Sequence, residues 1–134
     1  MTKPVLRYLI AHPFDEAETA LRQSLQEEGF GILTEVDVTA VLRQKLGVEV
    51  PRQKILGACN PSIAHKSITL APDVAAYLPC GIALRQGSRP DETVVVIQNP
   101  ESISEAFGQP ALREPAGEAM QRLEAALRRI GREA

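Results

Sequence analysis

Apolar side chains recur at helical spacing in two stretches of the chain. In the first stretch they fall every four residues from Ala17 to Leu25, and polar side chains fill the opposite face. Gly29 follows as a natural helix end. Asp15 and Glu18 have the spacing of a capping box, so we expect their carboxylates to meet free backbone N–H groups at the helix start. This pattern predicts an amphipathic helix.

The second helical stretch is an apolar stripe from Leu112 to Ile130. Two Glu–Arg pairs, Glu118 with Arg122 and Glu124 with Arg128, are spaced four residues apart along it. Side chains at that spacing lie next to each other on a helix, and opposite charges there stabilise it. We therefore expect a second long helix.

Five segments carry the signals of β-strands. Polar and apolar side chains alternate between Phe30 and Val38, which is the period of a strand with one solvated face. The other segments are short runs rich in branched residues, bounded by turn residues. We expect strands at Val5–Ala11, Phe30–Val38, Gln53–Ala58, Gly81–Arg85 and Thr93–Gln98.

Short helices are predicted between the strands. Thr39 is placed to cap one of them, which Gly47 would close. Asn60 and Asn99 each precede a proline, and an asparagine cap followed by proline at the first helical position opens a helix. The resulting short segments are Ala40–Leu46, Pro61 through His65, the turn Pro72–Leu78 and a helix after Pro100.

The order of these elements predicts an α+β fold within a single domain, residues 1–134. A strand, a long helix, four strands with small helical insertions and a second long helix favour an antiparallel sheet in a two-layer structure. Both long helices would cover one face of the sheet. The first and last predicted strands are apolar on both sides, so the second face should be covered too. Either the helical insertions or a second copy could cover it, and we favour a homodimer.

Charge and composition exclude several classes of protein. The formal net charge is −2, and 15 basic residues are scattered among 17 acidic ones, which argues against a nucleic-acid partner. The chain has no apolar run near the ~20 residues of a membrane span, and its N-terminal segment lacks the features of a signal peptide. The two cysteines do not suggest a disulfide framework. We expect a cytoplasmic protein without a membrane partner.

Cys59 is the first candidate for chemistry. It ends the third predicted strand, immediately before the helix that opens at Asn60-Pro61. A helix N-terminus stabilises a thiolate and can lower the pKa of a thiol below its free value of about 8.5. The alternative is that Cys59 is a small buried hydrophobic residue, which is the commonest fate of a free cysteine.

Cys80 starts the next predicted strand, so the two thiols would meet if these strands are neighbours. Such a pair could form a reversible disulfide, carry a persulfide or bind a soft metal. His65 could add an acid–base group or a third ligand, with His12 as a more distant fourth. However, Cys-x5-His-x14-Cys is not a familiar zinc spacing, so we assign no residue as a metal ligand, and a surface or helix-packing histidine is the simpler interpretation.

Glu35 and Asp37 offer a third possibility. They share one face of the second predicted strand, and paired carboxylates can act as acid and base. Together with His65 they could serve an enzyme acting on a small substrate. Strand alternation explains them equally well as solvent-facing residues.

Several segments resemble a known family. They are GFGILTEVDV from Gly29, ILGACNP from Ile55, Ala64-His65, and Leu78-Pro79-Cys80. In this order they are similar to the domain-of-unknown-function family 302, from about Tyr8 to the last helix. The resemblance implies a fold like the half-repeat of the TATA-box-binding protein, and it favours a dimer. It implies no activity, cofactor or catalytic residue.

The leading hypothesis is a small binding or accessory protein with a ligand, thiol or metal site around Cys59, Asn60, His65 and Cys80. In it Cys59 is the reactive or ligating group, and Asn60 caps the helix. His65 adjusts the local charge, and Cys80 resolves or co-ligates. The alternative is a non-catalytic dimeric module that recognises another protein through its sheet. The sequence identifies no cofactor.

Overall fold

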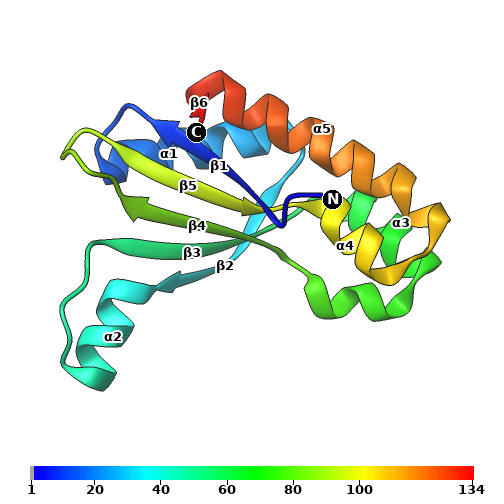
Figure 1. Cartoon of the computed structure of the whole chain (residues 1–134), viewed down its shortest axis with the longest axis horizontal. Coiled ribbons are helices and arrows are strands. Elements are labelled where there is room, and N and C mark those ends of the chain that lie inside the picture. The colour runs from blue at the N-terminus through cyan, green and yellow to red at the C-terminus, as the bar shows by residue number, and fades with distance from the viewer. Residues whose placement is uncertain (1) are drawn as a thin grey trace.

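The computed structural model describes residues 2–134. Six strands form one antiparallel sheet in the order β2-β3-β4-β5-β1-β6 (Figure 1). The strands are β1 (Val5–Ile10), β2 (Gly31–Asp37), β3 (Gln53–Cys59), β4 (Cys80–Gln86), β5 (Thr93–Gln98) and β6 (Arg132–Glu133). The helices are α1 (Phe14–Glu27), α2 (Val38–Leu46), α3 (Pro61–Leu70), α4 (Pro100–Phe107) and α5 (Arg113–Ile130), with 3-10 turns η1 (Pro72–Tyr77) and η2 (Pro110–Leu112). The predicted α+β class is confirmed.

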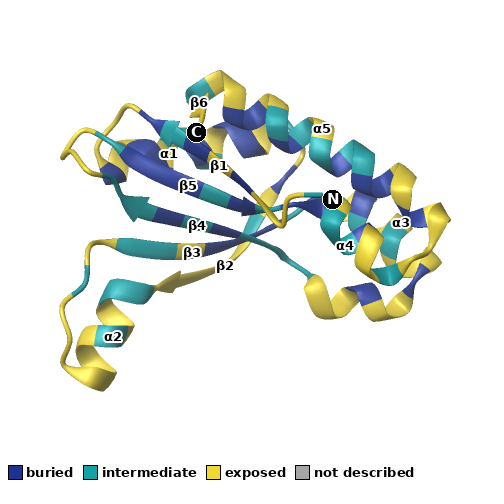
Figure 2. Ribbon diagram, viewed as in Figure 1, coloured by how far each residue is buried: buried dark blue, intermediate teal, exposed yellow. Residues whose placement is uncertain are grey.

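The main core lies between the sheet and the two long helices, α1 and α5. Strand alternation directs one row of side chains to this side, such as Tyr8 opposite Val95 and Ile82 opposite Ile97. Leu21 of α1 and other residues of the two long helices pack against this row and complete the main core. In Figure 2 the buried positions run along the central strands and the facing sides of the two helices.

The predicted capping box at the start of α1 is wrong. The helix begins after Pro13, and no side chain caps it within the described residues 2–134. Asp15 instead binds Arg52 at 2.7 Å, and Glu18 accepts from Lys54 at 3.0 Å. Because the helix begins at Phe14, Asp15 lies inside its first turn rather than at the cap position. Both carboxylates pair with cationic side chains that flank or belong to β3.

The short helix α2 starts earlier than predicted. Asp37 is its cap, and its Oδ1 accepts from the Ala40 N–H at 3.0 Å. Thr39, the predicted cap, uses its hydroxyl to accept from the Gln53 N–H at 2.7 Å. Gly47 ends the helix at φ +65°, as predicted, in the left-handed conformation that glycine adopts without strain.

The helical insertions do not spread over the second face of the sheet. α3, η1 and α4 gather at one end of it, and α2 projects at the other (Figure 1). The two-residue strand β6 was not predicted, because its pairing with β1 involves only Tyr8 and Leu9 and leaves no repeat in the sequence. No helix within residues 2–134 is long and apolar enough to cross a membrane.

Candidate functional site

A second, smaller apolar cluster lies beyond the end of the sheet. Ala71, Val74 and Leu112 are buried together there, and Phe107 and Leu78 pack against them. The ring of Tyr77 meets the ring of Phe107 edge to face, with centroids 5.6 Å apart. We call the segment that carries this cluster, α3 through η1 together with α4 and η2, the cap.

A pocket lies between the cap, the start of α5 and the end of the sheet, and we call it the cap pocket. The cavity volume of this pocket is about 60 Å³. Polar side chains on its wall come from two cysteines, Asn60, Ser67 and Ser104. The apolar wall consists of Phe30, Ala58, Ile63, Ala64, Val74, Leu78, Pro100, Ile103, Leu112, Pro115, Ala116 and Ala119.

Cys59 and Cys80 both line the cap pocket. The antiparallel pairing of β3 with β4 places Ala58 opposite Cys80, so Cys59 is the next residue along. Both cysteines are free and partly buried. The condition under which the two residues were expected to share one neighbourhood, that their strands are neighbours, is therefore met.

The environment of Cys80 disfavours its thiolate. Burial, and to a smaller extent repulsion between its charge and that of the nearby Cys59, raises the pKa of the Cys80 thiol to about 11. Cys80 is consequently a neutral thiol at physiological pH, a weak donor and acceptor rather than a nucleophile.

Asn60 fixes the turn between β3 and α3. Its Oδ1 accepts from the Ile63 N–H at 3.3 Å, which is the predicted cap, and its Nδ2 donates to the Glu28 carbonyl at 3.4 Å. Pro61 occupies the start of α3 as predicted. Asn60 is buried and joins the end of α1 to the start of α3, so it positions Cys59 at the wall of the pocket.

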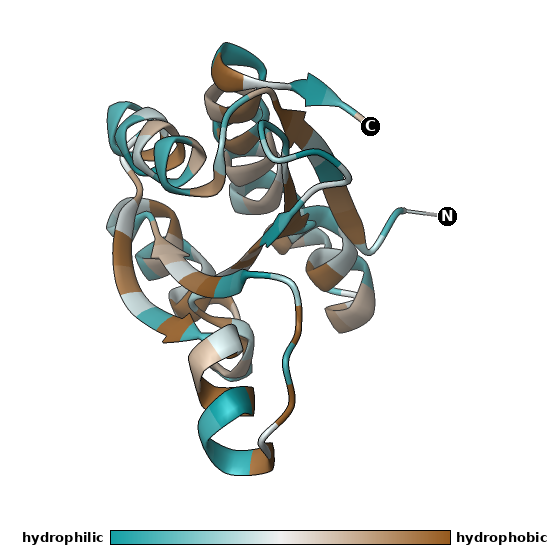
Figure 3. Cartoon of the chain, turned by 90° about the vertical axis from the view of Figure 1, so that its left-hand side faces the viewer, coloured by the Kyte–Doolittle hydropathy of each residue, from teal (hydrophilic) through white to brown (hydrophobic). Residues whose placement is uncertain are grey.

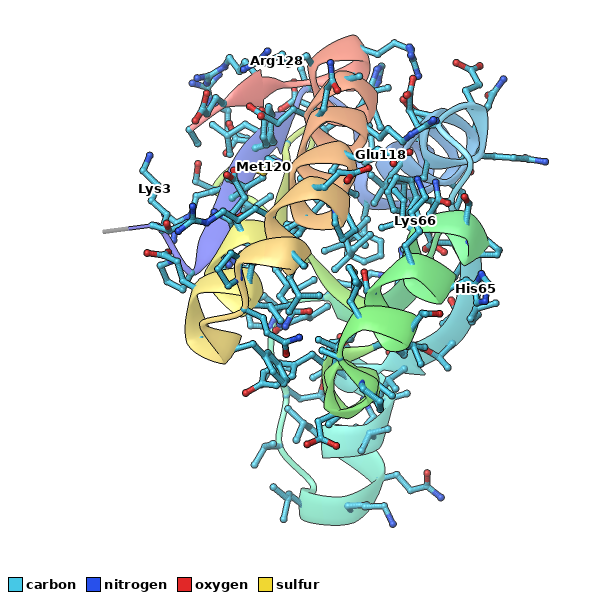
Figure 4. The ribbon with its side chains drawn as sticks, turned by 90° about the vertical axis from the view of Figure 1, so that its right-hand side faces the viewer. Lys3, His65, Lys66, Glu118, Met120 and Arg128 are labelled. Carbon is cyan, nitrogen blue, oxygen red and sulfur yellow. The ribbon has the colours of Figure 1, made fainter. Side chains whose placement is uncertain are left out.

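His65 does not line the cap pocket. It is exposed on α3, beside Thr69 and Glu114, in a separate surface depression. Figure 4 shows it pointing away from α5, whereas Lys66 reaches Glu118 of α5 at 3.3 Å. His12 lies 3.6 Å from Glu16 and is exposed. Among residues 2–134, no group of three or more metal-ligating side chains comes together.

The two carboxylates of β2 have separate roles. Glu35 lies 2.7 Å from Lys54 and 3.3 Å from Arg22, and the hydrogen bond from Lys54 holds the pKa of Glu35 below its usual range. Asp37 caps α2. Neither carboxylate shares the surface depression that contains His65.

Comparison with known proteins places the chain in a family. Residues 7–130 match the family described as "Domain of unknown function DUF302". The chain belongs to the DUF302 family. A crystal structure of an uncharacterized conserved DUF302 protein from Bacillus stearothermophilus has the same fold, with a TM-score of 0.88 at 28% sequence identity. The match covers 96% of this chain and 99% of that protein. No curated protein matches the chain significantly.

Sequence reasoning missed the cap side of the DUF302 pocket. Ser104 of α4 and Ala116 of α5 line the wall opposite the cysteines. A small residue in an apolar helical stripe is the usual signature of close packing, so Ala116 gave no sign of a pocket. Pro115, the residue before it, also lines the pocket, but a proline in the first turn of a helix is common and indicates no pocket.

Proposed function

We propose that this DUF302 protein binds a small apolar molecule in the cap pocket, with the thiols of Cys59 and Cys80 on the pocket wall. The observation that carries the proposal is that two free cysteines share one apolar pocket between two hydrophobic clusters. Ligand pockets are typically concave and apolar, with a few polar groups that orient the ligand.

The pocket offers few polar groups for a ligand. Asn60 uses its side-chain oxygen for the cap, and the Ser67 hydroxyl donates to the Ile63 carbonyl at 2.9 Å. The groups that remain are the two sulfur atoms and Ser104. An apolar or sulfur-tolerant ligand fits this wall, because a strongly polar ligand would lose its hydration without replacement hydrogen bonds.

The two thiols have different capacities. Cys80 stays protonated near neutral pH because burial raises its pKa to about 11. Any covalent capture of a thiol-reactive ligand therefore falls to Cys59, and Cys80 contributes an S–H and apolar contact. His65 contributes no contact to this proposal, because it lies in a different depression.

Titration with benzene, followed by methyl NMR, tests the proposal directly. Benzene is a demanding probe, because an engineered apolar cavity that binds it measures about 150 Å³. The cap pocket, at about 60 Å³, must widen by movement of the cap to admit it. We expect saturable shifts of the Ala58, Ala64 and Ile63 methyl groups. Ala116→Leu, which places a larger side chain in the pocket, should weaken benzene binding at least tenfold.

Ala125→Leu is the matched control. Ala125 is exposed on the same helix, so the substitution adds the same atoms without reaching the pocket. Circular dichroism confirms that each variant is folded. The proposal is wrong if no pocket methyl responds to benzene, or if folded Ala116→Leu binds benzene as tightly as Ala125→Leu does.

A further inference from the structure

The helix α2 is separated from the rest of the molecule. None of its residues, 38–46, is buried, and its neighbours in the fold are β2 and β3. Figure 3 shows it projecting away from the body of the protein. Both of its ends are nevertheless well formed, with Asp37 as cap and Gly47 as stop. A helix of nine residues is marginal in water without packing, so α2 needs a surface to pack against.

The apolar side chains of α2 are turned to solvent together with those of the adjoining strands. Leu46 is 69% exposed and Leu33, at the bulge of β2, is 67% exposed. Val36 and Ile55 are direct partners across β2 and β3 and are 44% and 42% exposed. We call this surface the arm face; it consists of Leu33, Val36, Val41, Leu46, Val48 and Ile55.

The open side of the sheet continues this apolar surface. Strand pairing aligns Val36, Ile55, Ala83 and Val96 in one row across four strands, on the side away from the Tyr8 and Leu21 core. Val96 and Ala83 are only partly covered. The row continues to the exposed Arg7 of β1, which pairs with Val96. A projecting apolar helix and an apolar stripe over four strands, with a cation at the end of the stripe, therefore occur on the same chain.

A second copy of the chain is the occupant that this arrangement fits. In a two-fold interface each copy presents the same patch, so each projecting helix can lie on the open sheet of the other copy. The six side chains of the arm face expose roughly 500 Å² per copy, more than half of the about 800 Å² per partner that a stable interface buries.

Charge on the arm is consistent with such a contact. Arg43 binds Glu49 through two hydrogen bonds, at 2.9 and 3.0 Å, so these charges compensate each other within the arm. Lys45 remains as a cation in the last turn, where it also favours the helix dipole. An apolar partner with little net charge suits this surface better than a polyanion.

We infer that the chain forms a two-fold homodimer in which α2 of each copy packs against the open sheet of the other through the arm face. Sedimentation equilibrium of the full chain tests this. The expected mass is twice the 14.6 kDa of the monomer. Leu46→Glu should raise the dimer dissociation constant at least about 100-fold, because the charge would be buried twice in a symmetric interface.

Leu70→Glu is the matched control, since Leu70 is an exposed leucine of α3 at the other end of the molecule. It should leave the mass unchanged. Leu33→Glu provides a second disruption on the arm face outside α2, in case Leu46→Glu also unwinds the helix. The inference is overturned if the unmodified chain is monomeric at 100-micromolar concentration. It is also overturned if folded Leu46→Glu and Leu33→Glu dimerise as tightly as Leu70→Glu does.

Discussion

The burial of Cys80 makes the stability of the fold depend on pH. Its thiol has a pKa of about 11 in the folded protein and 9.0 without the protein environment. Below pH 9 the thiol is protonated in both the folded and the unfolded chain, so it adds no pH dependence. Between pH 9 and 11 the unfolded chain loses the proton first, and stability falls with rising pH.

The expected loss attributable to Cys80 is roughly 2–3 kcal/mol in the free energy of unfolding once the pH passes 11. Urea denaturation at pH 8, 9, 10 and 11 measures it. Because lysines and tyrosines also titrate there, the relevant quantity is the difference between the unmodified chain and Cys80→Ala. That difference should shrink as the pH rises above 9. A difference that stays constant across this range would show that the folded protein accepts the thiolate easily.

Tyr8 shows how strongly the core excludes water. Its ring is 1% exposed, and its hydroxyl has no hydrogen-bond partner within residues 2–134. Burial is the main reason that the pKa of Tyr8 is raised, and Glu133 and Glu124 raise it further. The nearby Arg128 lowers that pKa, so the hydroxyl lies beside a cation although no well-aligned hydrogen bond joins them within residues 2–134.

At the scale of elements, the junction between β3 and α3 decides where Cys59 lies. Asn60 holds that junction with both ends of its amide, one to the Ile63 N–H and one to the Glu28 carbonyl. Loss of a cap of this kind costs typically ~1 kcal/mol, and the buried site adds the cost of the unpaired Glu28 carbonyl.

We therefore expect Asn60→Ala to lower the free energy of unfolding by about 1–3 kcal/mol. Asn60→Asp keeps the oxygen that caps α3 but loses the donor to Glu28, so it should cost less than alanine. Thermal or urea unfolding of the two variants gives the comparison. If both variants lose the same stability, the contact with Glu28 matters and the cap does not.

Asn60→Ala should also change how accessible the Cys59 thiol is to a reagent. When the junction loosens, Cys59 should become more accessible, so a neutral alkylating reagent should modify it faster in Asn60→Ala than in the unmodified chain. The Cys80→Ala background isolates the Cys59 signal. Asn99→Ala removes the corresponding cap of α4 and serves as the control, because that helix starts from β5 and carries no cysteine.

Most of the helices and strands could be predicted from the sequence. The residues that cap the helices could be predicted in only some cases. Asn60-Pro61 and Asn99-Pro100 open helices as predicted. Each asparagine accepts from a backbone N–H only two or three residues further along the chain, so this signal is local. The Asp15 prediction failed because the helix already starts at Phe14, so that Asp15 lies inside the first turn and its carboxylate pairs with Arg52. The residue at which a helix starts is therefore the part of such a local signal that the sequence determines least.

The candidate site divides in the same way. Pairing of β3 with β4 brought Cys59 and Cys80 to one pocket, as neighbouring strands predicted. We expected His65 in the site because it follows Cys59 closely in the sequence. Its position on α3 instead turns its side chain outward, into a separate surface depression. The wall supplied by α4 and α5 depends on contacts between distant segments, and no spacing in the sequence encodes it.

On the scale of the whole molecule, the two hydrophobic clusters are very unequal. The apolar cluster of the cap holds three buried residues, whereas the buried residues of the main core come from four strands and both long helices. Because protection against hydrogen exchange follows the cost of local opening, the cap should open at lower free energy than the central strands do. Amides of α3 and α4 should exchange through openings at least about 2 kcal/mol cheaper than those of β4, β5 and β1.

Leu112→Ala separates the two clusters. Leu112 is 3% exposed in the cap cluster and also lines the pocket. Removing its side chain should lower the opening free energy of the cap amides by about 2–4 kcal/mol. The β5 amides should change little if they already exchange through an opening that does not involve the cap. An equal loss of protection in β5 would mean that cap and sheet open as one unit. A ligand could then enter the pocket only through unfolding of the whole protein, whereas a separately opening cap gives it a route past α3 and α4.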